Sequence, residues 1–487
     1  MQFPILSTLI FLPIILSVFV MFARRANQTK ITAGLISFVN MILSFVLLAN
    51  FNKNLVVEQF VEQSMWIEKF NIQYFLAIDG VSLVLILLTT VLSFLAIVFS
   101  GEVKKPRVYF TAFLFLEGLA IGLFSAFDAV LFYVFFEAML IPMFLIIGVW
   151  GGENRIYATF KFFLYTLFGS LLFLVALLYM YVQFNTFDML TWANLGTSLS
   201  FEEQKWLFIA LFIAFAIKVP MIGVHTWLPD AHVQAPTSGS VILAGVLLKI
   251  GTYAMLRFII PMLPEATEFF AIYVMGLSVV AIVYASLLAY KQKDIKKMIA
   301  YSSIAHMGFI TLGLFALTEL AVQGAVLQMI NHGIVSAGLF FAIGVVYSRL
   351  HTRNIDYIGN LADKMPKYAV VFMILTLASV GLPGTANFIG EITILIGSYS
   401  SAPILTVLAI LGVLMGACYM LKLYKGMFYK QLDSKKLDSV TDLTLTECLV
   451  FLPLVISVFV LGLYPNVVFD LTEASVLNAL DFFIGGY

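Results

Sequence analysis

The stretch AIKVPMIGVHTWLPDAHVQAPTSGSVILAGVLLKIGTYAMLR, residues 216–257, indicates how the whole chain is built. It places Lys218 and Lys249 in the middle of long apolar segments, and Pro220, Pro229 and Pro236 interrupt the backbone between them. A lysine at the centre of a membrane helix costs about 2.5–3.5 kcal/mol on the insertion scale. Two such lysines in one helical hairpin therefore require a reason.

The composition is that of a protein that crosses a membrane many times. Of the 487 residues, 62% are hydrophobic and 11% are charged, and the mean hydropathy is +1.03, whereas soluble domains carry about 25% charged residues. Cys418 and Cys448 form no CxxC pattern, which argues against an iron–sulfur site, c-type haem attachment or structural zinc in this chain. The apolar N-terminus lacks the basic region and cleavage site of a signal peptide, so we expect a retained first helix.

Fourteen apolar runs are long enough to cross about 30 Å of hydrocarbon. They predict an all-α polytopic membrane protein, a single integral membrane domain over residues 1–487. The predicted spans are 4–22, 31–50, 76–100, 108–126, 128–150, 156–183, 206–228, 237–260, 269–290, 298–316, 321–348, 368–399, 403–429 and 446–464.

Lysines and arginines are distributed unequally between the two sets of loops that these spans create. Twenty-one lie in the loops on one side, including Lys435 and Lys436, and four lie on the other, among them Arg257. Since basic residues accumulate in cytoplasmic loops, this asymmetry predicts that both termini lie on the outer, periplasmic side. The segment that follows the last span, residues 465–487, is expected on that side as an outer-face tail, on the surface or on a neighbouring subunit.

Two of the spans are interrupted. The seventh has Pro220 two residues after Lys218, and the twelfth carries GLPGTAN at 381–387 in its middle. Gly and Pro leave backbone N–H and C=O groups without helical hydrogen bonds, and lipid cannot supply partners for them. Such breaks are therefore tolerated only inside protein or beside a water-filled cavity. The breaks lie five spans apart, which predicts two inverted five-helix repeats: spans 4–8 (residues 108–260) and spans 9–13 (residues 269–429).

A buried carboxyl group accompanies the first lysine. Glu137 lies halfway along the fifth span, in FYVFFEAMLIPMF, where a carboxyl group must be protonated or paired with a cation. Lys218 is a possible partner, either in a structural ion pair between two helices or in a pair that makes a proton site switchable. Glu117, in the fourth span, is also near the middle of the membrane, and its role stays open.

Lys249 is the stronger signal of the two lysines. Leu, Val and Ile surround it, and from the middle of a span it has no path along which to reach water. Arg257 lies two turns further along the same segment and is expected simply to reach the membrane interface. Asp79 and Asp128 lie at the ends of spans and are expected to be helix N-terminal acids or interface residues.

Polar side chains also recur on the tenth and eleventh spans. His306 follows Ser302 and Ser303 at helical spacing, and Gln328, Asn331, His332 and Ser336 form a similar stripe. One such histidine alone is as often a satisfied core residue, but two neighbouring stripes favour a hydrated passage, and histidine exchanges protons near neutral pH. Glu391 follows the break in the twelfth span, where an unwound turn admits water; the alternative is an ordinary interface carboxylate.

The sequence lacks the common motifs for nucleotide binding, metalloprotease activity and serine hydrolysis. It contains no P-loop, no GxGxxG between strand and helix, no HExxH and no Gly-x-Ser-x-Gly. His306 and His332 could be imagined as axial ligands of a haem, but one such pair within a line of lysines and glutamates is a poor match. His225, Asp230 and His232 lie in the loop after the seventh span, where capping, gating and simple solvation all remain open.

The order of these motifs resembles the antiporter-like subunits of respiratory complex I over nearly the whole chain. The matching segments are FYVFFEAMLIPM at 132–143, KVPMIGVHTWLPDAHVQAPTSGS at 218–240, LLKIGTYAMLR at 247–257, DIKKMIAYSSIAHMG at 294–308, INHGIVSAGLFF at 330–341 and GLPGTANFIGE at 381–391. Among these subunits the chain is most similar to the M type of the bacterial NADH:quinone oxidoreductase and its organellar counterparts. That type resembles this chain in carrying Glu, at position 391, where its sister subunits usually carry Lys.

The resemblance implies a fold, a function and a set of site residues. It implies fourteen helices with broken helices 7 and 12, and a proton relay formed by Glu137, Lys218, Lys249, His306, His332 and Glu391, in which Glu137 pairs with Lys218. It further implies a proton-translocating subunit of an enzyme complex in the bacterial inner membrane, without a redox centre, cofactor or metal of its own. NADH, FMN, iron–sulfur clusters and quinone are then expected in partner subunits of the membrane and peripheral arms.

Two other functions stay open at the level of sequence. A subunit of a multisubunit cation/proton antiporter would share the same core, although Glu391 argues against it. A quinone- or haem-binding membrane anchor is the alternative from another class. No nucleic-acid partner is expected.

Overall fold

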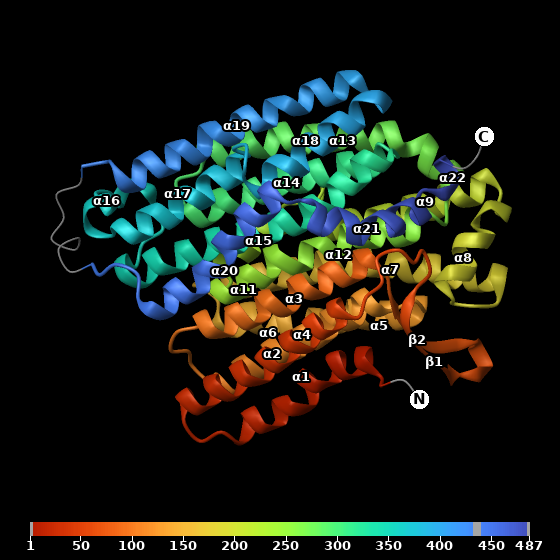
Figure 1. The fold of residues 1–487 in the computed structure, drawn as a ribbon, viewed down its shortest axis with the longest axis horizontal. Helices are drawn as coiled ribbons and strands as arrows, with labels where there is room; N and C mark the ends of the chain where they lie inside the picture. The colour runs from red at the N-terminus through yellow and green to blue at the C-terminus, as the bar shows by residue number, and fades with distance from the viewer. Residues whose placement is uncertain (1–2, 432–439, 485–487) are drawn as a thin grey trace.

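The structure of the chain is a computed structural model that describes residues 3–431 and 440–484. Lys435 and Lys436 of the predicted basic loops lie outside these residues, as do the last three residues of the predicted tail. Most of the described chain forms long helices that lie side by side in one elongated bundle (Figure 1).

Most helices run the length of this bundle without interruption. They are α1 (Ile5–Phe22), α2 (Ala26–Ala49), α3 (Gly80–Phe99), α4 (Pro106–Ser125), α7 (Arg155–Phe184), α13 (Pro264–Lys291), α14 (Ile295–Phe315), α15 (Glu319–Leu350), α19 (Pro403–Phe428) and α20 (Leu445–Leu463). By contrast, α9 (Phe201–Lys218) ends at the first of the two predicted breaks. Three further rows consist of consecutive pieces: α5 (Ala129–Ala138) with α6 (Leu140–Trp150); α11 (Thr237–Ile242), η3 (Leu243–Leu247), α12 (Leu248–Ala254) and η4 (Met255–Ile259); and α17 (Pro366–Val380) with α18 (Ala386–Ser401).

Shorter elements connect these rows. They are β1 (Gln59–Ile67), η1 (Glu68–Phe70), β2 (Ile72–Ile78), α8 (Met189–Leu195), η2 (Gly196–Ser198), α10 (Trp227–Gln234), η5 (Ile355–Tyr357), α16 (Leu361–Lys364), α21 (Asn466–Ala479) and α22 (Asp481–Ile484).

Within the described residues, twelve helical segments are long and apolar enough to cross a membrane. They coincide with twelve of the predicted spans. The other two predicted spans correspond to α9, which contains four charged residues, and to α17, a short apolar helix, followed by α18, which has 16 residues. These two are the spans that the sequence predicts to be broken.

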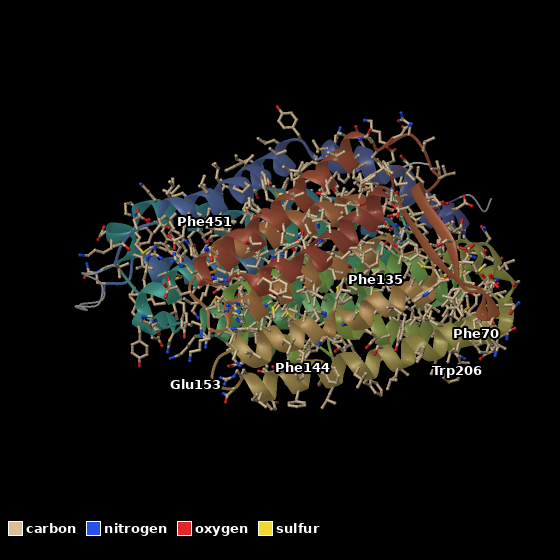
Figure 2. The ribbon with its side chains drawn as sticks, turned by 90° about the horizontal axis from the view of Figure 1, so that it is seen from below. Phe70, Phe135, Phe144, Glu153, Trp206 and Phe451 are labelled. Carbon is tan, nitrogen blue, oxygen red and sulfur yellow. The ribbon has the colours of Figure 1, made fainter. Side chains whose placement is uncertain are left out.

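The bundle has two chemically different ends. Both termini of the described chain and the β1–β2 hairpin lie at one end, which we call the hairpin end (Figure 1). The loops after α1 and α3, which contain basic residues, lie at the opposite end, which we call the basic end. Figure 2 shows Glu153 towards the basic end and Phe70 and Trp206 towards the hairpin end. Both termini therefore lie at one end of the bundle, opposite these basic loops.

The β1–β2 hairpin is a feature that the sequence analysis does not predict. Its strands are antiparallel, with Ser64 opposite Tyr74, and Asn71 takes a left-handed conformation at the turn. The Glu62 carboxylate accepts hydrogen bonds from the backbone N–H of Leu6 at 2.7 Å and of Ser7, so the hairpin holds the N-terminus of α1. Residues 76–78, predicted as the start of the third span, belong to β2, and α3 begins only after Asp79.

Polar caps set several helix boundaries. Asp79 and Asp128 accept hydrogen bonds from the first N–H groups of α3 and α5, as predicted for these acids. Ser200 with Glu203 and Thr444 with Glu447 form capping boxes at α9 and α20. The four N–H groups left free at a helix start are expensive to bury, so these side chains determine where each helix begins.

The backbone at the two interruptions is held by different hydrogen bonds. After α9, the Met221 N–H reaches the Ala216 carbonyl at 2.7 Å, and the Trp227 indole N–H donates to the Ile217 carbonyl at 2.8 Å. After α17, Gly381 takes a positive φ of 80°, which ends the helix and lets the Leu382 N–H bond the Leu377 carbonyl. Protein groups thus bind the carbonyls of Ala216, Ile217 and Leu377 beside the two breaks.

Two pairs of loops, which we call corners, have the same backbone hydrogen-bond pattern at opposite ends of the bundle. At the hairpin end, the Ala129 N–H donates to the Phe187 carbonyl at 2.8 Å and the Met189 N–H donates to the Phe127 carbonyl at 3.0 Å. At the basic end, the N–H groups of Ile295 and Ile355 donate to the carbonyls of Arg353 and Lys293, both at 2.9 Å. In each corner the start of a helix pairs with the segment after the following long helix, α7 or α15.

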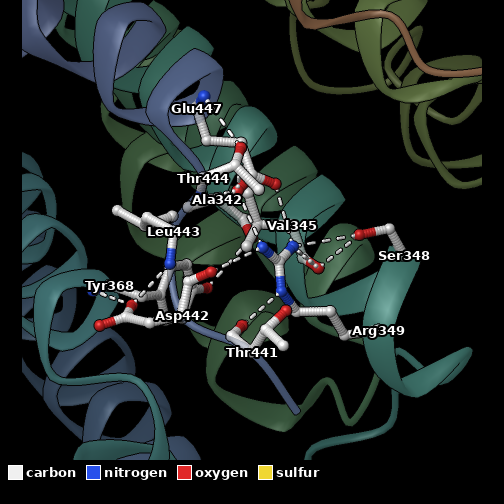
Figure 3. A network of polar contacts seen from close by, with 10 residues as sticks. All are labelled: Ala342, Val345, Ser348, Arg349, Tyr368, Thr441, Asp442, Leu443, Thr444 and Glu447. Atoms are coloured by element: carbon white, nitrogen blue, oxygen red, sulfur yellow. Dashed lines mark hydrogen bonds and ion pairs between the residues drawn. The ribbon is translucent and has the colours of Figure 1, made fainter.

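The start of α20 is anchored at the basic end by a polar network (Figure 3). The Arg349 guanidinium, near the end of α15, donates to both carboxylate oxygens of Glu447, at 2.9 and 2.8 Å, and to the Thr441 carbonyl. The Asp442 carboxylate accepts the Tyr368 N–H of α17 at 3.1 Å. Three helix ends are therefore joined through side chains of one short connection.

The segment after the last span packs against the chain itself. α21 lies across α3 near the hairpin end, where the Gly80 N–H donates to the Ser475 hydroxyl at 2.9 Å. A Cβ at Gly80 would lie 1.6 Å from the Leu471 carbonyl oxygen, so this approach requires glycine. Sequence alone had left open whether this segment contacts a neighbour.

Candidate functional site

A line of buried ionisable side chains runs through the middle of the bundle, across α12, α14, α15 and α18. Its first member is Lys249, whose side chain is fully buried. The Lys249 Nζ donates to the Ala244 carbonyl at 2.5 Å and contacts His332 Nδ1 at 2.7 Å. An isolated ammonium in such a place would be very unfavourable, so these two acceptors are what make the position tenable.

Two π-helical segments flank Lys249 on its own row. η3 precedes α12 and η4 follows it, where the sequence predicts one regular span over 237–260. A π-helical turn widens the helix and shifts the side chains that follow it, and such turns occur often at functional sites. The carbonyl that Lys249 binds, that of Ala244, lies within η3.

Two histidines carry the line onward from Lys249. His332 on α15 and His306 on α14 have ring centroids 5.6 Å apart, and both are buried. The His306 Nδ1 contacts Glu391 Oε1 at 2.8 Å. Among the described protein groups, neither Nε2 atom has a hydrogen-bond partner. Each ring thus contacts one member of the line through Nδ1, while its Nε2 has no partner among the described protein groups.

Glu391 is the last member of the line and lies in the second turn of α18. Its Oε1 also accepts the Gln328 amide N–H at 3.1 Å. Next to it, the Asn331 amide donates to the Ala386 carbonyl at 2.7 Å, which ties the beginning of α18 to α15. The polar stripe that the sequence predicts on α15 therefore faces the broken row.

Glycines allow α15 and α18 to approach closely enough for these contacts. A Cβ at Gly390 would lie 2.3 Å from the Gln328 Oε1, and a Cβ at Gly324 would lie 2.8 Å from the Ile394 nitrogen. Side chains at either position would push the helices apart. The place of Glu391 beside Gln328 thus depends on both glycines.

The remaining two predicted site residues are not joined to the line by a direct contact. Lys218 is buried at the end of α9, and its Nζ lies 4.5 Å from the centroid of the Phe136 ring. Glu137 is half-buried on α5, and its Oε1 finds no hydrogen-bond partner among the described residues. The structure does not join Glu137 and Lys218 in an ion pair, because the lysine occupies the face of the neighbouring aromatic ring instead.

Two buried basic groups near the basic end are absent from the predicted site. The Lys296 side chain, counted above as a loop residue, is buried and donates to the Ala235 carbonyl at 2.5 Å. His232 is fully buried and stacks on Phe340 with centroids 4.6 Å apart. The sequence could have indicated Lys296 through its helical spacing, because Lys296, Ser303 and His306 share one face of α14.

Other ionisable groups have local partners away from the line. The Glu117 carboxylate, between α1, α2 and α4, accepts the Ser37 hydroxyl at 2.8 Å and the Asn40 amide at 2.9 Å. Arg257, expected at the membrane interface, is instead buried in an ion pair with Asp79. Across the described residues, no group of three or more His, Cys, Asp or Glu side chains is placed to hold a metal ion.

Comparison with known proteins identifies the family. The model of the NADH:quinone oxidoreductase/Mrp antiporter transmembrane family matches residues 126–416. NADH-quinone oxidoreductase subunit M of Rickettsia typhi is 45% identical over 490 residues, covering 99% of both chains. The subunit M of Rhodobacter capsulatus is 47% identical over 467 residues, covering 93% of this chain and 90% of the relative.

A solved structure agrees with these relatives. A chain of respiratory complex I from Thermus thermophilus, with bound NADH, superposes with a TM-score of 0.88 at 30% identity and covers 98% of both chains. The match extends over the uninterrupted helices and both broken rows, since almost the whole chain is covered. This chain therefore belongs to the NADH:quinone oxidoreductase/Mrp antiporter family of integral membrane proteins, among the M-type subunits.

Proposed function

We propose that this chain is the proton-translocating M-type subunit of an NADH:quinone oxidoreductase and that it moves protons along the line Lys249, His332, His306 and Glu391. The observation that carries the proposal is the continuity of this line: contacts of 2.7 and 2.8 Å at its two ends and two histidine rings 5.6 Å apart between them. Hydrogen-bonded groups that alternate between donor and acceptor are what stepwise proton transfer requires.

The chemistry of each member fits one step. Lys249 donates a proton towards His332 Nδ1, and the imidazole releases one from its other nitrogen. Rotation of the rings, or a bridging water, brings that proton to His306, and Glu391 receives it at the contact with His306 Nδ1. Low polarity around these groups makes each charge state expensive, so a proton arrives only as another leaves.

Glu137 and Lys218 form the other arm of the proposed relay. Lys218 makes a cation–π contact with Phe136, the residue that precedes Glu137 in the chain. It does not form an ion pair with Glu137 itself. An open pair of this kind is a switch, because closing it stabilises the charge on Lys218 and opening it favours release of the proton to Lys249. Movement of α5 relative to α9 then controls loading of the line.

The proposal includes the arrangement of the chain in the membrane. The twelve apolar segments together with α9 and with α17–α18 make fourteen crossings, and residues 108–260 and 269–429 are two inverted repeats. The matched corners at Asp128 and Asp294, at opposite ends of the bundle, support the inversion. The basic end faces the cytoplasm of a bacterial inner membrane, and both termini, with the tail 465–487, lie on the periplasmic side.

Energy for the transport comes from electron transfer elsewhere in the complex. NADH, FMN, iron–sulfur clusters and quinone belong to partner subunits, and this chain does no redox chemistry itself. The relatives named NADH-quinone oxidoreductase subunit M, similar over their full length, support these partners. The chain then contacts other membrane-arm subunits, including its sister antiporter-like subunits.

The test is to replace the buried lysines. Lys249→Met and Lys218→Met remove the amine while keeping an unbranched side chain, and we expect NADH-driven proton uptake by inverted membrane vesicles to fall at least tenfold per NADH oxidised. The complex should still assemble, which a native gel checks. Lys291→Met, at an exposed position near the basic end of α13, is the matched control. Wild-type pumping stoichiometry in either buried variant would overturn the proposal.

A second measurement separates the alternative function. A subunit of a multisubunit cation/proton antiporter would not co-purify with large water-soluble flavin and iron–sulfur subunits. We expect the flavin and iron–sulfur subunits to co-purify with this chain when it carries an affinity tag and is extracted in mild detergent. Recovery of membrane subunits only would favour the antiporter.

A further inference from the structure

A buried ion pair closes the hairpin end of the helix row that carries Lys249. The Arg257 guanidinium on η4 contacts the Asp79 carboxylate at the start of α3, and the side chains are 12% and 9% exposed. The guanidinium also lies 5.0 Å from the centroid of the Tyr253 ring and 5.5 Å from that of Phe127. The proposed relay does not use any of these groups.

This ion pair lies on the same side of the row as Lys249. Lys249 and Tyr253 are four residues apart within α12 and share one face of it, and Arg257 on η4 lies over the Tyr253 ring. The Tyr253 hydroxyl is 2.9 Å from the Ser82 hydroxyl, and an Arg257 N–H donates to the same Ser82 oxygen at 3.2 Å. The Tyr253 hydroxyl donates to the Phe124 carbonyl at 3.0 Å. The Ser82 hydroxyl therefore links the guanidinium to Tyr253, which lies one turn from Lys249.

A small cavity lies on the other side of Arg257. It has a volume of about 70 Å³ and lies at the hairpin end, between α21, α8 and η4. Its polar lining consists of Arg257, Glu58, Ser475 and Asn478. The volume accommodates water, and Glu58 supplies a carboxylate there. The guanidinium thus contacts both this cavity and the pair of hydroxyl groups that lies one turn from Lys249.

Arginine cannot pass a proton between these hydroxyl groups and the cavity. Its guanidinium stays protonated in proteins, accepts no hydrogen bond and repels a second positive charge. The Asp79 carboxylate that fixes it is itself engaged by Arg257 and by the Ser82 N–H at 2.9 Å. Charged groups block proton passage in other membrane pores by the same physics.

We propose that Arg257, positioned by Asp79, is an electrostatic barrier that stops protons passing between Lys249 and the hairpin-end cavity. Protons that reach Lys249 then continue only towards His332, and protons outside the hairpin end do not leak back into the relay. This inference rests on the proposed function, because a barrier matters only if Lys249 carries protons.

The experiment measures passive proton flux through the purified complex in liposomes, with an imposed potassium diffusion potential and a pH dye inside. The main variant is Asp79→Asn with Arg257→Met, which removes both charges and leaves neither one buried alone. We expect its passive proton flux to rise at least fivefold over that of the parent complex. Arg257→Lys keeps the charge and should stay within twofold of the parent.

A matched control removes another largely buried ion pair, of similar exposure. Arg349 and Glu447 at the basic end are 12% and 16% exposed, and Arg349→Met with Glu447→Gln should not increase the flux. Equal leaks in both double variants would assign the effect to loosened packing and overturn the barrier. A parent-level flux in the Asp79→Asn, Arg257→Met variant would overturn it directly.

The route of the leak is tested by adding Lys249→Met to the leaking variant. We expect this third substitution to return the flux to the parent level, because the leak passes through Lys249. A leak that persists would place the barrier on another path and overturn the inference. Failure of the proposed function appears differently, as normal NADH-driven pumping in the Lys249→Met variant alone.

Discussion

Replacing Glu391 by glutamine removes one charge from the end of the proposed relay and almost nothing else. The carboxylate Oε1 accepts hydrogen bonds from His306 Nδ1 at 2.8 Å and from the Gln328 amide at 3.1 Å. Glutamine has nearly the same volume and keeps an acceptor oxygen, so both contacts can persist. What disappears is the negative charge that faces His306 and the group that receives a proton.

The expected effect follows from the separation of the two groups. With about 4 Å between the centres of charge and an effective dielectric constant of about 20, a protonated His306 gains about 4 kcal/mol from the carboxylate. If protonated His306 is a required intermediate, the loss of this energy slows proton passage by about a thousandfold. The structural cost is smaller, roughly 1 kcal/mol for each hydrogen bond that loses its charged acceptor.

The assay compares proton uptake at equal rates of NADH oxidation. Inverted membrane vesicles carrying the parent complex or the Glu391→Gln variant are supplied with NADH and a short-chain quinone, and a fluorescent dye reports acidification of the interior. We expect the variant complex to assemble and its acidification per NADH oxidised to fall below one tenth of the parent value. Glu268→Gln, the same chemical change at an exposed position of α13, should leave it unchanged.

Acidification within twofold of the parent, at the parent rate of NADH oxidation, would refute the reasoning, because a relay cannot lose its terminal acid without effect. Failure of the complex to assemble would also contradict it, since the two contacts of Glu391 are predicted to survive.

Three further changes test neighbouring statements. Glu391→Lys should retain more pumping than Glu391→Gln, because it restores a group that exchanges protons and the Gln328 Oε1 is free to accept from it; the same vesicle assay decides. Gly390→Ala should displace the Gln328 amide from Glu391 and lower the thermal midpoint of the complex, since its Cβ would lie 2.3 Å from Gln328 Oε1, and removing a hydrogen bond to a charged group costs about 1.5–3 kcal/mol. Burial raises the pKa of the Glu58 carboxyl above its usual value of 4.5. The folded form therefore holds a proton more tightly, and the parent loses stability as pH rises from 4.5 through the raised pKa. The thermal midpoint of the Glu58→Gln complex should increase relative to that of the parent over this rise in pH, and a difference that shrinks would contradict this.

The sequence alone predicted much of the architecture, because apolar runs and helix-breaking residues act on the segment in which they occur. Apolar runs of sufficient length predict the membrane segments, and the structure has helices at each of them. Pro220 and the glycines at 381 and 384 predict the two breaks, since both residue types alter the backbone wherever they occur. The presence of Lys249, His306 and Glu391 inside apolar runs predicts buried ionisable groups for the same reason.

Only the tertiary structure decided which of these groups meet. Lys249 and His332 are 83 residues apart, and His306 and Glu391 are 85 apart, so the first contact depends on how α15 packs against the row of Lys249 and the second on how α14 packs against α18. The tertiary structure likewise shows Glu137 on α5 and Lys218 on α9 without an ion pair between them.

The structure also corrected readings that depend on what surrounds a segment. Arg257 lies within reach of the membrane interface by sequence, yet Asp79, 178 residues away, holds it inside the protein. Lys296 looks like a loop residue, but the carbonyl of Ala235 receives it in the interior. A sequence reveals where a charge sits along a helix, whereas its burial and its partner are properties of the packed bundle, because they depend on groups that only folding brings near.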